Sequence, residues 1–92
     1  APRPASFYRR AYYHHRLGNL EAALSDLTQA IALAQQEEEY DLEMLYFVRA
    51  DVLVALGRKA EARADLEHVS DGYARMTTRV RTKEEILADC SE

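Results

Sequence analysis

The sequence is poor in the residues that interrupt helices and in the residue that cross-links chains. It has 3 glycines, 2 prolines and a single cysteine, Cys90, among 92 residues. Few turn formers beside abundant Ala, Leu, Glu and Arg favour helices, so we expect an all-α fold. One cysteine excludes an intramolecular disulfide, which is consistent with a reducing compartment. We therefore expect a cytoplasmic protein.

Long apolar runs are also absent. No segment approaches the roughly 20 apolar residues that a membrane-spanning helix needs, and no signal-peptide pattern is visible. We therefore expect no membrane partner. Hydrophobic residues make up 48% of the chain and charged residues 30%, as in soluble globular proteins, and the length suits one small domain.

The charges of the two signs are segregated along the chain. Residues 1–18 contain no acid, whereas residues 19–48 contain no Lys or Arg, and the net charge is -4. A net acidic protein is a poor candidate for nucleic acid, because phosphate binding needs a broad basic face. The alternative is a local contact in which bases stack on Tyr8 and Tyr12. The arginines available for it are Arg3, Arg9, Arg10 and Arg16.

The chain contains an internal repeat with a period of 39 residues. The segment "FYRRAYYHHRLGNLEAALSDLTQA", which begins at Phe7, aligns without a gap with "YFVRADVLVALGRKAEARADLEHV", which begins at Tyr46. Arg-Ala, Leu-Gly and Asp-Leu occur at the same places in both segments, which chance rarely produces. The matched positions are Phe7/Tyr46, Tyr8/Phe47, Arg10/Arg49, Ala11/Ala50, Leu17/Leu56, Gly18/Gly57, Ala23/Ala62, Asp26/Asp65, Leu27/Leu66 and Ala30/Val69.

Each unit has the pattern of a helical hairpin. Apolar and small residues recur at helical spacing on both sides of a central glycine. Gly18 and Gly57 stand where a tight turn between helices needs a permissive backbone. The two predicted hairpins span about residues 6–39 and 41–70.

This pattern resembles the tetratricopeptide repeat (TPR) family, whose units are helical hairpins with an aromatic residue early in the first helix and an alanine in the second. Phe7 and Tyr46 match the aromatic residue, and Ala23 and Ala62 match the alanine. The resemblance covers about residues 5–70. It implies that antiparallel hairpins stack as a short TPR-like α-solenoid.

The period is longer than the 34 residues typical of the family. The surplus falls in "AQQEEEYDLEM", which contains neither Pro nor Gly. We expect longer helices that bend near Tyr40 and Asp41, and the alternative is a loop over residues 35–43. A calcium site is not expected here, because it needs a ligand-spaced loop with a turn glycine.

The two ends of the chain do not belong to the repeat. Residues 1–5 contain both prolines and are expected to form an extended arm. Residues 72–92 are expected to form a C-terminal helix, or more than one, that caps the array. Thr82 and Glu85 have the spacing of a capping box that starts a helix.

One charge pair occurs in both units. Arg10 and Asp26 of the first unit recur as Arg49 and Asp65 of the second. Each arginine is on the first helix of its hairpin and each aspartate is on the second, so antiparallel packing brings them together. We predict two structural ion pairs, which are commoner than catalytic or ligand-binding arginines.

A stripe of Tyr and His on the first helix is the candidate binding site. Tyr8, Tyr12 and His15 are spaced i, i+4 and i+7, and the resemblance places them in the concave groove that first helices line in this family. Rigid aromatics and Arg make good interface anchors. The alternative is that Tyr8 packs between repeats and Tyr12 is a half-exposed surface residue. The predicted groove residues are Tyr8, Arg9, Tyr12, His15, Arg16, Phe47 and Asp51.

No chemistry is predicted from the sequence. Nucleophile elbows, phosphate-binding glycine loops and paired catalytic carboxylates are absent. Adjacent His14 and His15 diverge by about 100° on a helix, unlike zinc ligands one turn apart. We therefore expect no metal, no cofactor and no enzyme activity. We expect an adaptor, scaffold or chaperone-like module that binds a peptide or helix of a protein partner.

The alternative function is self-association. Repeat arrays usually need three or more units for stability, and this chain has two. The unmatched ends can then dock on a second copy in a homodimer, or the chain can be one part of a longer TPR array.

Overall fold

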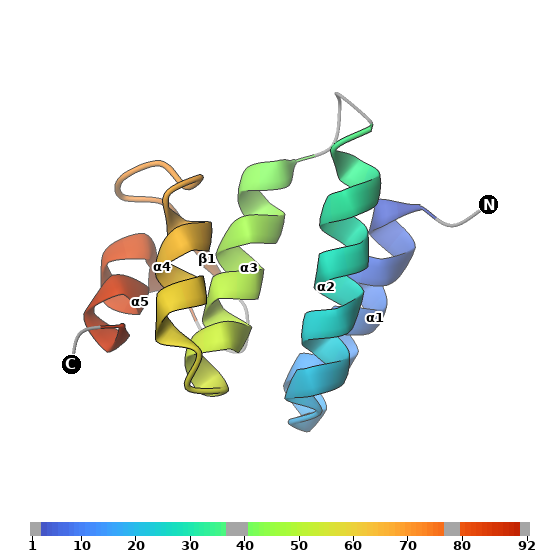
Figure 1. The fold of residues 1–92 in the computed structure, drawn as a ribbon, viewed down its shortest axis with the longest axis horizontal. Coiled ribbons are helices and arrows are strands. Elements are labelled where there is room, and N and C mark those ends of the chain that lie inside the picture. The colour runs from blue at the N-terminus through green and yellow to red at the C-terminus, as the bar shows by residue number, and fades with distance from the viewer. Residues whose placement is uncertain (1–2, 37–40, 77–79, 91–92) are drawn as a thin grey trace.

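The structure is a computed structural model that describes residues 3–36, 41–76 and 80–90. Within these ranges the chain forms five helices and two short strands, and the helices follow one another across the molecule in chain order (Figure 1). The predicted fold, two antiparallel helical hairpins stacked side by side, is confirmed. The elements are α1 (Pro4–Leu17), α2 (Leu20–Ala34), α3 (Leu42–Ala55), α4 (Lys59–Leu66), β1 (Ala74–Met76), β2 (Val80–Thr82) and α5 (Lys83–Asp89).

The two hairpins have the same turn between their helices. Gly18 has φ 82° and Gly57 has φ 78°, a left-handed conformation that costs other residues about 1–2 kcal/mol. After Gly18, the Asn19 N–H donates to the His14 carbonyl at 2.8 Å and closes the end of α1. The second turn has the same bond at the equivalent positions, at 2.9 Å. The sequence repeat is therefore also a repeat of backbone geometry.

Small residues allow the helices to approach closely. Ala11 of α1, Ala23 and Ala30 of α2 and Ala62 of α4 are almost completely buried. Leu27, also fully buried, fills the space between these alanines and the neighbouring helices. None of the described helices is both long and apolar enough to cross a bilayer.

The junction between the hairpins differs from the expected pair of lengthened helices. Helix α2 ends at Ala34, a turn follows at residues 35–36, and α3 begins at Leu42. Asp41 caps α3, because its carboxylate accepts a hydrogen bond from the Met44 N–H at 3.0 Å. The expected bend near Tyr40 lies outside the described residues.

The C-terminal segment contains strands where we expected helix. Ala74 pairs with Thr82, and Met76 with Val80, in a two-stranded antiparallel hairpin. Residues 73–82 contain three Thr, one Val and one Tyr, which favour strands over helices. Helix α5 then begins at the predicted capping box: the Thr82 side chain accepts from the Glu85 N–H at 3.1 Å, and Glu85 accepts from the Thr82 N–H at 3.0 Å.

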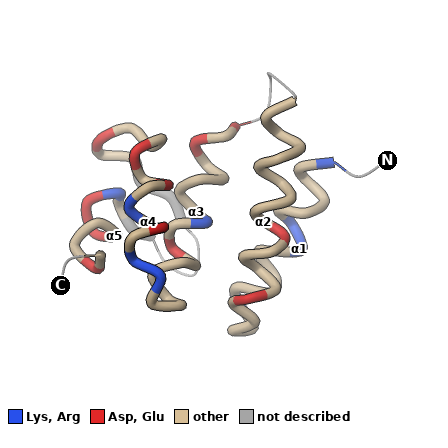
Figure 2. The backbone as a smooth tube through the Cα atoms, viewed as in Figure 1, with Lys and Arg blue, Asp and Glu red and all other residues tan. Residues whose placement is uncertain are grey.

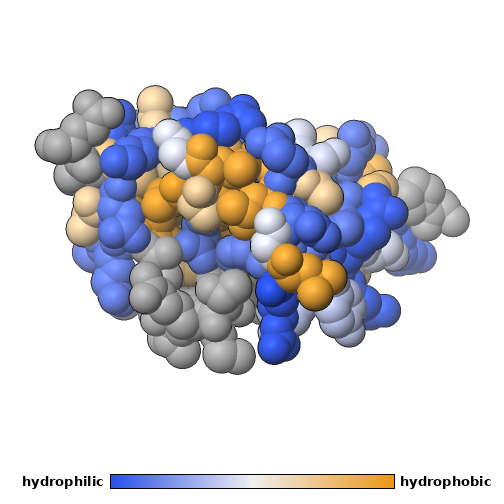
Figure 3. Space-filling model, turned by 90° about the horizontal axis from the view of Figure 1, so that it is seen from below, coloured by the Kyte–Doolittle hydropathy of each residue, from blue (hydrophilic) through white to orange (hydrophobic). Residues whose placement is uncertain are grey.

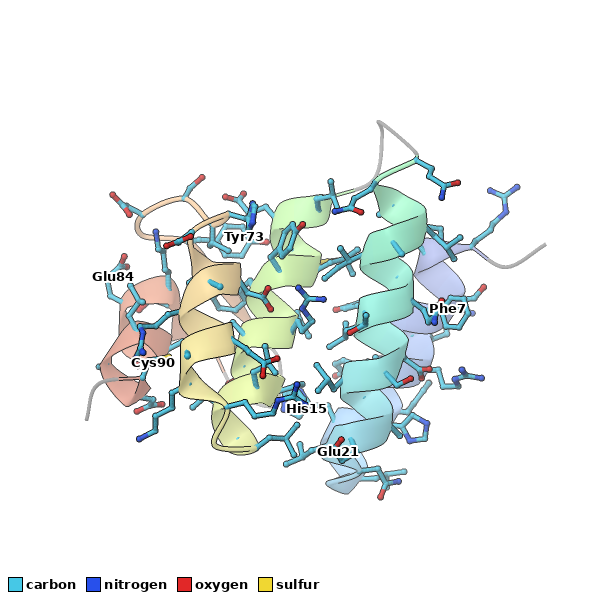
Figure 4. The ribbon with its side chains drawn as sticks, viewed as in Figure 1. Phe7, His15, Glu21, Tyr73, Glu84 and Cys90 are labelled. Atoms are coloured by element: carbon cyan, nitrogen blue, oxygen red, sulfur yellow. The ribbon has the colours of Figure 1, made fainter. Side chains whose placement is uncertain are left out.

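The C-terminal segment is attached to the second hairpin. The Tyr73 ring packs against Phe47 of α3 with 5.0 Å between ring centroids, and Figure 4 shows Tyr73 beside α3. The Lys83 Nζ donates to the Val69 carbonyl at 2.7 Å, and Arg63 of α4 donates to the Cys90 carbonyl at 2.6 Å. The strands β1 and β2 and helix α5 therefore cover the second hairpin at the C-terminal end of the solenoid.

Candidate interaction surface

The outer side of α1 carries a hollow of about 400 Å³. Residues at i, i+3, i+4, i+7 and i+8 share one side of a helix, which explains how a single helix lines it. The structure brings three predicted groove residues, Tyr8, Arg9 and Tyr12, together here. We call this the α1 surface, and it is lined by Ala5, Tyr8, Arg9, Tyr12 and Tyr13.

Tyr13 is the member of the α1 surface that sequence reasoning missed. Its side chain is 61% exposed, and its ring meets the Tyr12 ring edge-on, with 6.0 Å between centroids. The prediction followed the stripe of Tyr8, Tyr12 and His15 with its flanking arginines, and it did not include Tyr13. The spacing i, i+4 from Arg9 to Tyr13 was the signal that would have found it.

Arg9, which lines the α1 surface, and Arg16, which lies beside it, make this region positive. The Arg16 guanidinium lies 5.7 Å from the centre of the Tyr12 ring, a cation–π distance. Arg9 and Arg16 have no carboxylate partner in the part of the chain that the structure describes, whereas Arg10 is held by Asp26. Figure 2 shows blue segments and no red ones along α1. The surface therefore combines aromatic rings with unpaired positive charge.

Two predicted groove residues, Phe47 and Asp51, do not line an open groove. Phe47 is 0% exposed and Asp51 is 4% exposed. The C-terminal segment covers this side of α3, where the Tyr73 ring lies on Phe47. This corrects the expectation that residues of α3 form the second wall of the site. The accessible predicted residues are those of α1.

His15 lies apart from the α1 surface, at the joint between the hairpins. Its side chain extends from α1 toward α3 (Figure 4) and is half-buried. Burial lowers the pKa of His15, and the Asp51 carboxylate of α3 partly opposes this shift. Burial at this joint therefore favours the neutral form of the imidazole.

We expect His15 to make stability depend on pH. Because its pKa is lower in the folded chain than the ordinary 6.5 or so, the unfolded chain binds the proton more readily, and the free energy of unfolding falls as pH decreases below about 6.5 until the folded pKa is passed. Urea midpoints at several pH values between 7.5 and 5 measure this for the wild type and His15→Gln. A midpoint with the same pH dependence in both proteins contradicts the assignment.

Both predicted ion pairs are formed across their hairpins. Arg10 donates from Nε and Nη2 to the two carboxylate oxygens of Asp26 at 2.8 and 2.7 Å, and Arg49 donates in the same way to Asp65 at 2.7 and 2.6 Å. The bonds from Arg10 lower the pKa of the Asp26 carboxyl. These contacts use the edge of each guanidinium that Nε and Nη2 form, and neither arginine is among the residues that line the α1 surface.

The end of the molecule that carries the interhelical turns has an apolar area of its own. Figure 3 shows orange atoms in the middle of this end, surrounded by polar residues. Leu17, which precedes the Gly18 turn, is 75% exposed. It lies one turn beyond Tyr13 on α1, so apolar surface continues from the α1 surface toward this end.

Comparison with known proteins agrees with this geometry. A family model described as "Tetratricopeptide repeat" matches residues 4–37 and 45–71, which contain the two hairpins. Over 56 residues, 61% of this chain, the sequence is 41% identical to "Protein FlbA" of Caulobacter vibrioides. The match spans only 9% of the length of that relative. No solved structure matches the chain. The two matched hairpins place this chain in the tetratricopeptide repeat family.

Proposed function

We propose that this chain is a non-catalytic adaptor or scaffold module whose α1 surface binds a segment of a partner protein. TPR units indicate a protein-interaction module. The observation that carries the finer proposal is the open hollow of about 400 Å³ between tyrosines and Arg9 on α1. The corresponding side of the second unit is closed.

The side chains of this hollow suit protein binding. Tyr and Arg are enriched at the positions that contribute most to interface affinity. A tyrosine loses little conformational entropy on binding, since it has two side-chain torsions, and it offers both a ring and a hydroxyl. Tyr8 is half-buried and packs against the core, so the surface is anchored before a partner arrives.

Affinity capture with matched variants tests the proposal. The double variant Tyr8→Ala/Tyr12→Ala removes two walls of the hollow, and we expect it to lose one specific partner that the wild type retains. Tyr46→Ala is the control, because Tyr46 is a half-buried tyrosine of the second unit that stacks on His68. Circular dichroism establishes that each variant is folded. A partner list unchanged by the double variant contradicts the proposal.

A further inference from the structure

The C-terminal segment closes on α3 the side that is open on α1. Moving the residues of the α1 surface along the chain by the repeat period leads to five residues of α3, and all of them are buried. The Tyr73 ring lies on this side of α3, against Phe47, and α5 packs on α3 as well. We call the described residues after Gly72, which are 73–76 and 80–90, the cover. The five residues of α3 are Met44, Phe47, Val48, Asp51 and Val52.

Hydrogen bonds join the beginning of the cover to α5. The Lys83 N–H donates to the Tyr73 carbonyl at 2.7 Å, and the N–H of Gly72, just before the cover, donates to the Glu84 carboxylate at 3.2 Å. A two-stranded hairpin and a helix of 7 residues are each marginal in water on their own. The strands and α5 therefore depend on one another, and we expect them to leave α3 as one cooperative unit.

The chain before the cover has a fixed point that is followed by an exposed turn. Val69 is buried, and the Ser70 N–H donates to the Glu43 carboxylate of α3 at 2.7 Å. Asp71 and Gly72 then form a turn on the surface, and the Asp71 side chain is 96% exposed. Rotation of the backbone in this turn leaves the packing of the two hairpins intact. The turn is therefore where the cover can pivot.

The cover contributes little to the buried core. Among the described residues, its buried core members are Ile86 and Cys90, and the Tyr73 ring is only half-buried on Phe47. The larger set of buried residues from α1 to α4 holds the two hairpins together. The hydrogen bond from Arg63 to the Cys90 carbonyl is replaced by bonds to water when the cover leaves. Opening the cover therefore costs less free energy than unfolding the hairpins.

We infer that the cover is a hinged autoinhibitory element. It opens at Asp71 and Gly72 while both hairpins stay folded, and when closed it withholds α3 from the partner of the α1 surface. The opening itself is independent of the proposed function, whereas the access of the partner to α3 rests on it. Equivalent residues of stacked repeats face the same way, so Phe47 continues the side that carries Tyr8. The closed molecule therefore presents this side of one unit, and the open molecule presents it on both.

The single cysteine reports the opening, because Cys90 belongs to the cover and is fully buried when the cover is closed. The rate at which an aromatic disulfide reagent labels this thiol is measured in the intact chain without urea. Tyr73→Ala removes the ring that packs on Phe47, and we expect labelling to become about tenfold faster. Ile31→Val is the matched control, since Ile31 is a buried residue of α2 outside the cover. It should lower the urea midpoint, followed by circular dichroism, and leave the labelling rate unchanged.

A synthetic peptide of residues 70–92 tests whether the vacated side of α3 accepts a segment from another molecule. Fluorescence anisotropy of the labelled peptide measures its binding to the wild type and to the Tyr73→Ala chain. The cover of the wild type competes at the high effective concentration of an attached segment, so we expect the peptide to bind the Tyr73→Ala chain about tenfold more tightly. A peptide that itself carries Tyr73→Ala is the matched control and should bind this chain more weakly.

Three results would overturn the inference. If Ile31→Val accelerates labelling in proportion to its loss of stability, Cys90 is reached only when the whole domain unfolds, and there is no hinge. This comparison needs only the wild type and one conservative variant. Wild-type labelling as fast as that of the urea-unfolded chain would mean that the cover is not closed.

Equal binding of the peptide to the wild type and to the Tyr73→Ala chain would remove the autoinhibitory role. None of these measurements uses the partner protein. If they fail while capture still depends on Tyr8 and Tyr12, the proposed function stands and this inference falls. If capture does not depend on those tyrosines, the proposed function falls and the hinge is still decided by the labelling of Cys90.

Discussion

Phe47→Ala is expected to destabilise the domain by about 4 kcal/mol, whereas Tyr8→Ala, the same position in the first unit, should cost only about 1 kcal/mol. Phe47 is fully buried under Tyr73, and removing such a ring loses its transfer free energy and leaves a cavity. Tyr8 is half-buried beside an open hollow that solvent can fill. A loss of about 4 kcal/mol is a large part of the stability of a domain of this size.

Urea unfolding followed by circular dichroism measures both variants, since the chain has no Trp to report by fluorescence. Phe47→Leu is the matched control: it retains most of the buried volume and should lose about 1 kcal/mol. Equal losses for Phe47→Ala and Tyr8→Ala would show that the C-terminal segment does not cover α3 in solution.

The parts of the fold that the sequence predicted are those that local pattern and repetition determine. Arg-Ala, Leu-Gly and Asp-Leu recur at one spacing, and each recurrence has a physical counterpart. Gly18 and Gly57 adopt the same left-handed turn, and the repeated Arg and Asp meet across each hairpin. A feature present twice in register constrains the structure more strongly than either copy does alone.

The parts that sequence reasoning missed depend on contacts between segments far apart in the chain. The spacing of apolar residues after Gly72 fits one helical face, but β-branched residues and pairing with a second strand decided the outcome. Phe47 was expected in an open groove because the family resemblance places the first helix of each unit along the groove, and Phe47 matches Tyr8 in the repeat. Only the packing of Tyr73 shows that one position is closed and the other open.

The two ion pairs share one geometry but differ in exposure, so they should differ in their contribution to stability. The Arg49 side chain is 20% exposed and the Arg10 side chain is 63% exposed, since Arg49 lies between α2 and α4 and Arg10 is at the open end. Asp65→Asn should lower the free energy of unfolding by about 2 kcal/mol. The amide nitrogen of the new side chain faces a guanidinium donor and cannot accept from it, so Arg49 loses one of its two charged hydrogen bonds. Asp26→Asn should cost less, because water can hydrate Arg10. Urea midpoints at pH 7 measure both, and Arg49→Lys, which keeps the charge but not the bidentate contact, is the control.

The contribution of the pair between Arg10 and Asp26 to stability should disappear in acid, over a pH range that the pKa of Asp26 sets. The pKa of Asp26 is lower in the folded chain than its ordinary value near 3.8, because Arg10 bonds the ionised carboxylate. The stabilisation by this pair is therefore complete above about pH 4 and is lost as pH falls toward the folded pKa, since the unfolded chain binds the proton first. Asp26→Asn removes the titrating group, so its urea midpoint should fall less steeply than that of the wild type below pH 4. Curves that stay parallel down to pH 2.5 would show that Arg10 and Asp26 are not paired in solution. If the urea midpoint of Asp26→Asn depends less on pH than that of the wild type, as we expect, the pair between Arg10 and Asp26 persists in water although Arg10 is largely exposed.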